Sequence, residues 1–150
     1  MAKGSNPTRV VLLIVLALVA TSGVSYMMRP KELIDWRTDY YAARAEAEKS
    51  HKFLVVYLTA TWCGPCQRMK HTTWADQSVA TAMNDFVPVK IDVDEQKQLA
   101  YDLSPDKAIP MPQLLMITPD GRIVMAATGY MDPTDFVKWL QGKPVAAGIK

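Results

Sequence analysis

The chain begins with one long apolar run and then alternates between amphipathic and apolar segments. Residues 10–28 contain no charged side chain, and Lys3 and Arg9 precede them. About 20 apolar residues can span a bilayer as a helix, and a shorter apolar core behind a basic head is typical of a secretory signal peptide. The uncharged length favours a membrane anchor, whereas hydroxyl residues between positions 21 and 25 favour cleavage. Either alternative places the rest of the chain outside the cytoplasm, because basic residues stay on the cytoplasmic side.

Beyond residue 35 the pattern predicts helices and strands in alternation. The expected strands are apolar runs, and the expected helices carry apolar residues on one face. Asp76, and Asp132 followed by Pro133, are typical capping signals. Asp39 lies near an expected helix start, where its negative charge suits the helix dipole. Arg44 and Glu48 have the spacing of an i,i+4 ion pair. The expected helices cover 36–52, 63–70, a short stretch after Asp76, a stretch opened by Asp94 and Glu95, and 133–140; the expected strands cover 53–58, 86–93, 114–117 and 123–127.

This order of elements predicts an α/β fold. Strands separated by helices indicate parallel pairing through right-handed crossovers, and the turn Pro119-Asp120-Gly121 indicates a final antiparallel hairpin. We therefore expect a mixed central sheet with helices on both faces. The expected organisation is a membrane anchor or signal peptide at 1–28, a linker at 29–35, one domain at 36–142 and a C-terminal tail at 143–150.

Charge and cysteine content narrow the function. The net charge is +2, and without Lys3 and Arg9 the 15 remaining basic residues match the 15 acidic ones. Such a balance does not favour nucleic-acid binding. The two cysteines, Cys63 and Cys66, are the only ones in the sequence. A disulfide between them would close a very short loop and contribute little to stability, so a chemical role explains the pair better.

The segment Cys63-Gly64-Pro65-Cys66 follows an apolar strand and opens a predicted helix. Disulfide exchange needs an attacking thiolate and a second thiol that resolves the mixed disulfide. At a helix N-terminus the unpaired N–H groups and the dipole lower a cysteine pKa. Pro65 fits the first turn, where its missing N–H has no partner to lose. Cys63 is thus the predicted nucleophile and Cys66 the resolving thiol.

A zinc site is the alternative use of these cysteines. His51 and His71 would have to complete the four ligands, but their spacing does not match known structural zinc sites. We therefore interpret both histidines as solvated surface residues and expect neither a metal nor another cofactor.

The segment Ala60-Thr61-Trp62-Cys63-Gly64-Pro65-Cys66 resembles the active-site segment of the thioredoxin superfamily. The resemblance covers roughly residues 36–140 and implies a thioredoxin-like fold and thiol–disulfide oxidoreductase activity. It is strongest for exported members with an extra N-terminal helix. It also implies a cis peptide bond before Pro112, support of the cysteines by Trp62, Gly64, Pro65 and Pro112, and a substrate-binding surface formed by Met111, Pro112 and Gly129.

Two positions depart from the family pattern. Tyr57 stands where thioredoxins keep a buried aspartate that handles the proton of the resolving thiol, and Gln113 stands where they usually have threonine. Lys90 matches a lysine beside that aspartate, although a solvated strand-end lysine is the simpler interpretation.

The predicted function is therefore a reductase of disulfides in exported proteins. Gly-Pro between the cysteines resembles the dipeptide of reducing thioredoxins and adds no side-chain donor to the thiolate. We expect a potential of about −270 to −200 mV, a monomer, and a membrane thiol relay as electron donor. The alternatives are a binding or holdase module on the same scaffold and a disulfide oxidase or isomerase.

Overall fold

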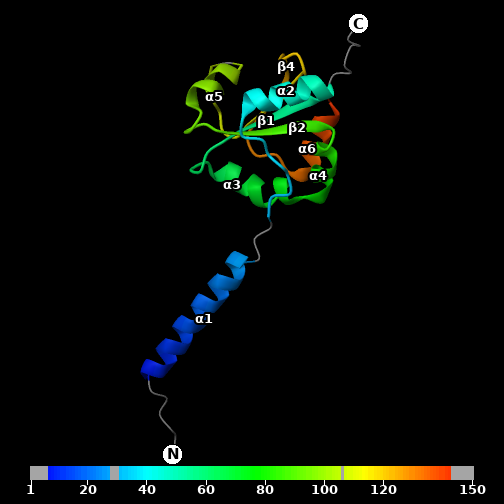
Figure 1. Ribbon diagram of the computed structural model, residues 1–150. Helices are drawn as coiled ribbons and strands as arrows, with labels where there is room; N and C mark the ends of the chain where they lie inside the picture. The colour runs from blue at the N-terminus through cyan, green and yellow to red at the C-terminus, as the bar shows by residue number, and fades with distance from the viewer. Residues whose placement is uncertain (1–6, 28–30, 106, 143–150) are drawn as a thin grey trace, which may run out of the picture. The chain divides into compact units, whose positions relative to one another are not determined.

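The computed structural model describes residues 7–27, 31–105 and 107–142 (Figure 1). The chain divides into two units, Met1–Pro30 and Lys31–Lys150. The predicted tail at 143–150 lies outside the described residues.

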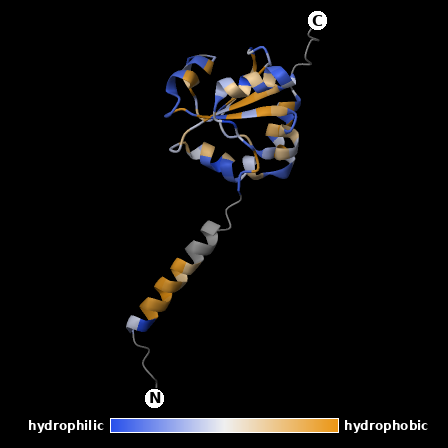
Figure 2. Cartoon of the chain, in the orientation of Figure 1, coloured by the Kyte–Doolittle hydropathy of each residue, from blue (hydrophilic) through white to orange (hydrophobic). Residues whose placement is uncertain are grey.

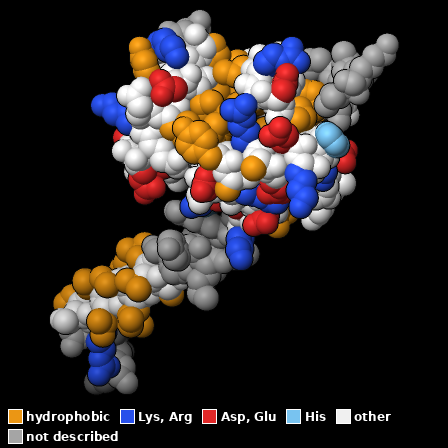
Figure 3. Space-filling view, turned by 45° about the horizontal axis from the view of Figure 1, so that its top comes forward, with side chains coloured by type: hydrophobic (Ala, Val, Ile, Leu, Met, Phe, Trp, Pro, Cys, Tyr) orange, Lys and Arg blue, Asp and Glu red, His pale blue; other side chains and the backbone are white. Residues whose placement is uncertain are grey.

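In the first unit the described residues form one helix, α1, which spans Pro7–Met27. Its side chains from Val10 to Val19 are mainly aliphatic and exposed, as the orange segment in Figure 2 and the space-filling view in Figure 3 show. Among the residues that the structure describes, none of the helices has the length and apolar character that a bilayer crossing needs.

The second unit is built on a sheet of four strands in the order β2-β1-β3-β4. The central strand β1 (Phe53–Thr59) pairs in parallel with β2 (Phe86–Asp92) and antiparallel with β3 (Gln113–Ile117). The hairpin partner of β3 is β4 (Ile123–Thr128). Residues of β1 and β3 are buried almost throughout, since helices cover both faces of the sheet. The predicted mixed sheet is confirmed.

Helices lie on both faces, as predicted. Figure 1 shows α2 (Tyr40–Ser50) and α5 (Lys97–Leu103) on one side of the sheet, and α3 (Gly64–His71), α4 (Gln77–Met83) and α6 (Pro133–Gln141) on the other. A short 3-10 turn, η1 (Thr73–Ala75), joins α3 to α4.

The predicted aspartate caps are confirmed at α4 and α6, whereas Asp39, predicted only as a charge that suits the helix dipole, is the N-cap of α2. The side chain of Asp39 accepts hydrogen bonds from two N–H groups of α2, Asp76 does the same for α4, and Asp132 caps α6 ahead of Pro133. Each cap satisfies donors that the first helical turn leaves unpaired.

Two local predictions are wrong. The helix expected to open at Asp94 and Glu95 begins later, at Lys97, without a side-chain cap. The guanidinium of Arg44 lies beside the hairpin turn and donates to the carbonyl of Asp120 at 3.2 Å, so its partner is a tertiary one rather than Glu48. For Arg44 the contact with the hairpin turn outweighs an i,i+4 ion pair, which is worth only a few tenths of a kcal/mol.

The segment before α2 is extended along the sheet, whereas the sequence pattern predicted that the helix begins at residue 36. Arg37 forms a parallel bridge with Val89: its N–H donates to the carbonyl of Pro88 at 3.0 Å, and its carbonyl accepts from Lys90 at 2.9 Å. Leu33 donates to the carbonyl of Trp74 at 2.7 Å. The two bonds of Arg37 give partners to the outer edge of β2, which explains why the chain stays extended here.

Aromatic side chains fill the core between the sheet and α6. The ring of Trp74 lies 4.9 Å from Tyr57, 5.1 Å from Trp36 and 5.0 Å from Phe136, in each case edge to face or nearly so. Such pairs add stability beyond the area they bury. This cluster joins β1, through Tyr57, to η1 and α6, through Trp74 and Phe136.

Candidate active site

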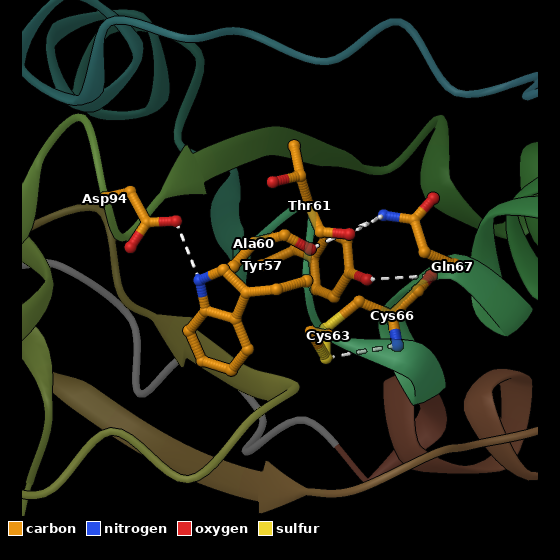
Figure 4. Close-up of a disulfide and its surroundings, with 8 residues drawn as sticks. Tyr57, Ala60, Thr61, Cys63, Cys66, Gln67 and Asp94 are labelled. Atoms are coloured by element: carbon orange, nitrogen blue, oxygen red, sulfur yellow. Dashed lines mark hydrogen bonds between the residues drawn. A yellow bond between two sulfur atoms is a disulfide. The ribbon is translucent and has the colours of Figure 1, made fainter.

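Cys63 and Cys66 are joined by a disulfide at the start of α3 (Figure 4). Cys63 is the N-cap residue, and the N–H of Cys66 donates to its sulfur at 3.2 Å. Pro65 lies in the first turn, as predicted. Both cysteines are buried, with exposed fractions of 3% and 1%. The predicted position of Cys63 at the helix start and of Cys66 one turn later is confirmed.

The first turn of α3 favours negative charge on the Cys63 sulfur. It carries no acidic side chain, while the last turn carries Arg68, Lys70 and His71. When the disulfide is opened, the Cys63 thiolate faces the unpaired N–H groups at the positive end of the helix dipole, which stabilise it. The Cys66 N–H already points at this sulfur.

Trp62 stands at the surface beside Cys63. Its side chain is exposed at 66%, yet its indole Nε1 donates to Oδ2 of Asp94 at 2.8 Å (Figure 4). The turn after β2 brings Asp94 to this place. The role of Asp94 was missed from the sequence, since only the pairing of β1 with β2 joins positions so far apart.

The loop before β3 lies at the same end of the sheet as the disulfide. Gln113 pairs with Leu58 near the end of β1, so the residues before it lie near the start of the Cys63 loop. The Met111–Pro112 peptide is cis, as predicted. Gly129 has φ of +87° and donates to the carbonyl of Pro112 at 2.8 Å. A glycine suits that positive φ because it has no Cβ.

Gln113, the first departure from the family pattern, is buried rather than directed at a substrate. Its Oε1 lies 3.0 Å from the hydroxyl of Ser104, which also contacts the carbonyl of Ala108. The side chain thus joins the start of β3 to the loop that follows α5.

Tyr57, the second departure, lies directly behind Cys66. Its hydroxyl donates to the carbonyl of Cys66 at 3.4 Å, and burial raises the pKa of the phenol. At neutral pH this side chain is therefore a hydrogen-bond donor and not a base.

A small cavity of about 110 Å³ adjoins Tyr57 and Cys66. Lys90 lines it and binds both carboxylate oxygens of Glu32 at 2.8 Å. The simpler interpretation of Lys90 as a solvated lysine is wrong, since its side chain is 25% exposed and that of Glu32 18%. Glu32 was missed because it lies in the segment predicted as a linker.

The histidines of the zinc alternative lie on separate elements. His51 is the exposed C-cap residue of α2, and His71 is the last residue of α3. The two sulfurs that a zinc site would require are bonded to each other.

A family model described as thioredoxin-like matches residues 35–119, more than half of the chain. The chain belongs to the thioredoxin-like family. The enzyme class predicted from the sequence, a thioredoxin-like thiol–disulfide oxidoreductase, is confirmed at the level of this family.

Curated relatives of this thioredoxin-like chain include two kinds of protein. Thioredoxin-2 of Pyricularia oryzae is 37% identical over 90 residues, which are 59% of this chain and 47% of that protein. The thiol:disulfide interchange protein DsbD of Campylobacter jejuni is 21% identical over 107 residues, 71% of this chain but 19% of that protein. The chain thus spans less than half the length of either.

A solved structure supports the thioredoxin-like fold independently. The reduced C-terminal domain of DsbD from Neisseria meningitidis superposes with a TM-score of 0.58 at 24% identity, over 67% of this chain and 90% of that domain. At this identity the likeness concerns the fold.

Proposed function

We propose that this thioredoxin-like protein is a disulfide reductase that acts on exported proteins through Cys63 and Cys66. The observation that carries the proposal is the disulfide at the N-terminus of α3 with Gly64 and Pro65 between its cysteines. Neither intervening residue has a side-chain donor, so the Cys63 thiolate depends on the helix terminus for its stabilisation. A thiolate stabilised only in this way does not make the disulfide strongly oxidising.

The proposed reaction transfers one electron pair to the substrate. A reductant first opens the Cys63–Cys66 disulfide. The Cys63 thiolate then attacks one sulfur of a substrate disulfide and releases the other as a thiolate. Cys66 attacks Cys63 in turn, so the internal disulfide re-forms and the second substrate sulfur leaves. The substrate is reduced, and the cysteine pair is oxidised to the state described above.

A substrate segment has a surface to bind beside the exchanging sulfur. Trp62 is exposed next to Cys63, and Met111, Pro112 and Gly129 lie on the loops at the same end of the sheet. We assign these residues to substrate binding, with Gly64 and Pro65 setting the entry into the helix. One copy of the chain carries both exchanging cysteines, so we propose that the protein acts as a monomer.

The proposed location is outside the cytoplasm. It is supported by the basic residues ahead of the apolar run in the sequence and by the similarity to DsbD, a protein named for thiol:disulfide interchange. Residues 1–28 serve in this proposal as an export segment, retained as an anchor or cleaved. A reductase in an oxidising compartment needs a supply of electrons, and a thiol relay in the membrane is the proposed donor.

Equilibration of the purified protein in graded glutathione buffers tests the redox direction. A potential of about −270 to −200 mV supports a reductase, whereas one close to −120 mV marks an oxidant and contradicts the proposal. The Cys63→Ser variant is the control, because it cannot form the internal disulfide. A wild-type protein that does not exchange with glutathione would favour a binding module.

A further inference from the structure

The resolving step of the proposed reaction requires a proton acceptor for Cys66. A thiol must lose its proton before its sulfur can attack a disulfide. Cys66 is only 1% exposed, so bulk water does not reach its sulfur freely. The cavity of about 110 Å³ behind it offers space for proton transfer, since Cys66 lines its wall.

This cavity has polar side chains in its wall and is large enough for water. A cavity of about 10–15 Å³ already admits one water molecule when polar partners surround it. Five titratable side chains from four parts of the fold line the cavity together with Cys66: Glu32 from the segment before α2, Tyr57 from β1, Lys70 from α3, and Lys90 and Asp92 from β2.

Three of these five groups are unsuited to accept a proton. Lys70 and Lys90 are cations without a lone pair. Tyr57 keeps its proton at neutral pH, because burial raises the pKa of the phenol, and donates to the carbonyl of Cys66. Two carboxylates remain, Glu32 and Asp92.

Of the two carboxylates, Glu32 is the one fixed on the cavity. Lys90 binds both of its oxygens at 2.8 Å, and its negative charge acts on the Tyr57 hydroxyl, which in turn bonds to Cys66. Asp92 uses its Oδ1 to accept the N–H of Asp94 in the turn after β2.

We propose that Glu32, held in place by Lys90, accepts the proton of the Cys66 thiol across this cavity in the resolving step. The Cys66 S–H bond breaks and the proton passes through cavity water to the Glu32 carboxylate. The Cys66 sulfur forms the bond to Cys63, and the substrate sulfur departs with the electron pair. Glu32 then releases the proton to water. The inference rests on the proposed function and deepens it.

A single-turnover reaction separates the two exchange steps. The reduced protein is mixed with a nitrobenzoate aromatic disulfide whose released thiolate is coloured. The first release reports the attack by Cys63, and the second reports resolution by Cys66. In the Glu32→Gln variant we expect the second phase to slow about tenfold or more at neutral pH, as loss of a general base does, with the first phase unchanged. An unchanged first phase also shows that the site is folded.

The matched control is Glu46→Gln. Glu46 forms a comparable ion pair, at 2.8 Å with Arg37 of the same extended segment, but does not line this cavity. Its variant is expected to show both phases at the wild-type rate. Glu32→Asp should recover part of the second phase, because it keeps the carboxylate.

A thiolate titration distinguishes proton acceptance from a structural effect. In the Cys63→Ser background Cys66 is the sole thiol, and removing the Glu32 charge should move its thiolate midpoint to lower pH. A second phase that is slower although the thiol is more acidic is the signature of a lost proton acceptor. An unaffected second phase in Glu32→Gln, or slowing in Asp92→Asn instead, overturns the proposal. If the wild-type protein releases no second thiolate, the proposed function itself fails.

Discussion

Trp62 donates its indole N–H to Asp94 at 2.8 Å, and this bond ties the loop before α3 to the turn after β2. Asp94→Ala should release the indole from its position beside Cys63. We expect a several-fold loss of kcat/KM for a disulfide-bonded protein substrate. The change in stability should be small, because exposed hydrogen bonds contribute about 0.5–1.5 kcal/mol. Steady-state reduction assays and denaturant unfolding measure the two effects.

Two further variants isolate that bond. Asp94→Asn keeps an acceptor oxygen and should retain most of the activity. Glu95→Ala removes the neighbouring exposed carboxylate, whose side chain has no role in positioning Trp62. Equal losses in Asp94→Ala and Glu95→Ala would show that general surface charge matters rather than the bond.

The order of the two cysteines predicts which variant traps partners. Cys66→Ser leaves the Cys63 nucleophile without a resolving thiol, so it should accumulate mixed disulfides with exported proteins. Cys63→Ser should not, since Cys66 lies within α3 and not at the helix terminus that stabilises a thiolate. Non-reducing gels of cell extracts compare the two. Trapping by Cys63→Ser alone, or equally by both, contradicts the assignment of roles.

The apolar run behind Lys3 and Arg9 predicts export of the domain. A reporter that is active only outside the cytoplasm, fused after Lys150, should be active. The matched control changes Leu13 and Leu16 to charged residues, which should abolish export. Activity of a cytoplasmic reporter at the same position would rule out the proposed location and the proposed substrates.

The buried phenol of Tyr57 should make the protein less stable at alkaline pH. Burial raises the pKa of its phenol in the folded state above the ordinary value. Below about pH 10 the folded and the unfolded chain therefore both hold the proton, and the contribution of the phenol to the free energy of unfolding is constant. Above that pH the unfolded state loses its proton first, and stability falls by up to about 1.4 kcal/mol per pH unit. Denaturant midpoints between pH 8 and 11 measure this effect.

The Tyr57→Phe variant should remove that part of the alkaline loss, because it keeps the ring in the aromatic cluster and deletes the titrating hydroxyl. Tyr40→Phe is a useful comparison, since burial also raises the pKa of Tyr40. If Tyr57→Phe follows the wild-type pH curve, the buried phenol is not responsible.

The sequence pattern predicted those parts of the fold that depend on local signals. The caps at Asp76 and Asp132, the apolar strands and the placement of Cys63 at a helix start each follow from residues close together in the chain. The cis bond before Pro112 came from a family resemblance and not from local propensity.

What the sequence pattern missed depends on contacts between distant segments. Asp94 became a partner of Trp62 only through the pairing of two strands, and Glu32 reached Lys90 only because the segment that follows it docks on η1 through Leu33 and on β2 through Arg37. Edge pairing of that kind is not encoded in periodicity, so a segment that resembles a linker proved to contribute to the candidate site.

The bridge between Arg37 and Val89 also bears on where the working domain begins. An open strand edge is a template on which another chain can add. Here the chain's own preceding segment occupies part of the β2 edge. Trimming the protein to the start of α2 would therefore open that edge to self-association. The same cut would remove Glu32, so solubility and the proposed proton acceptor would be lost together.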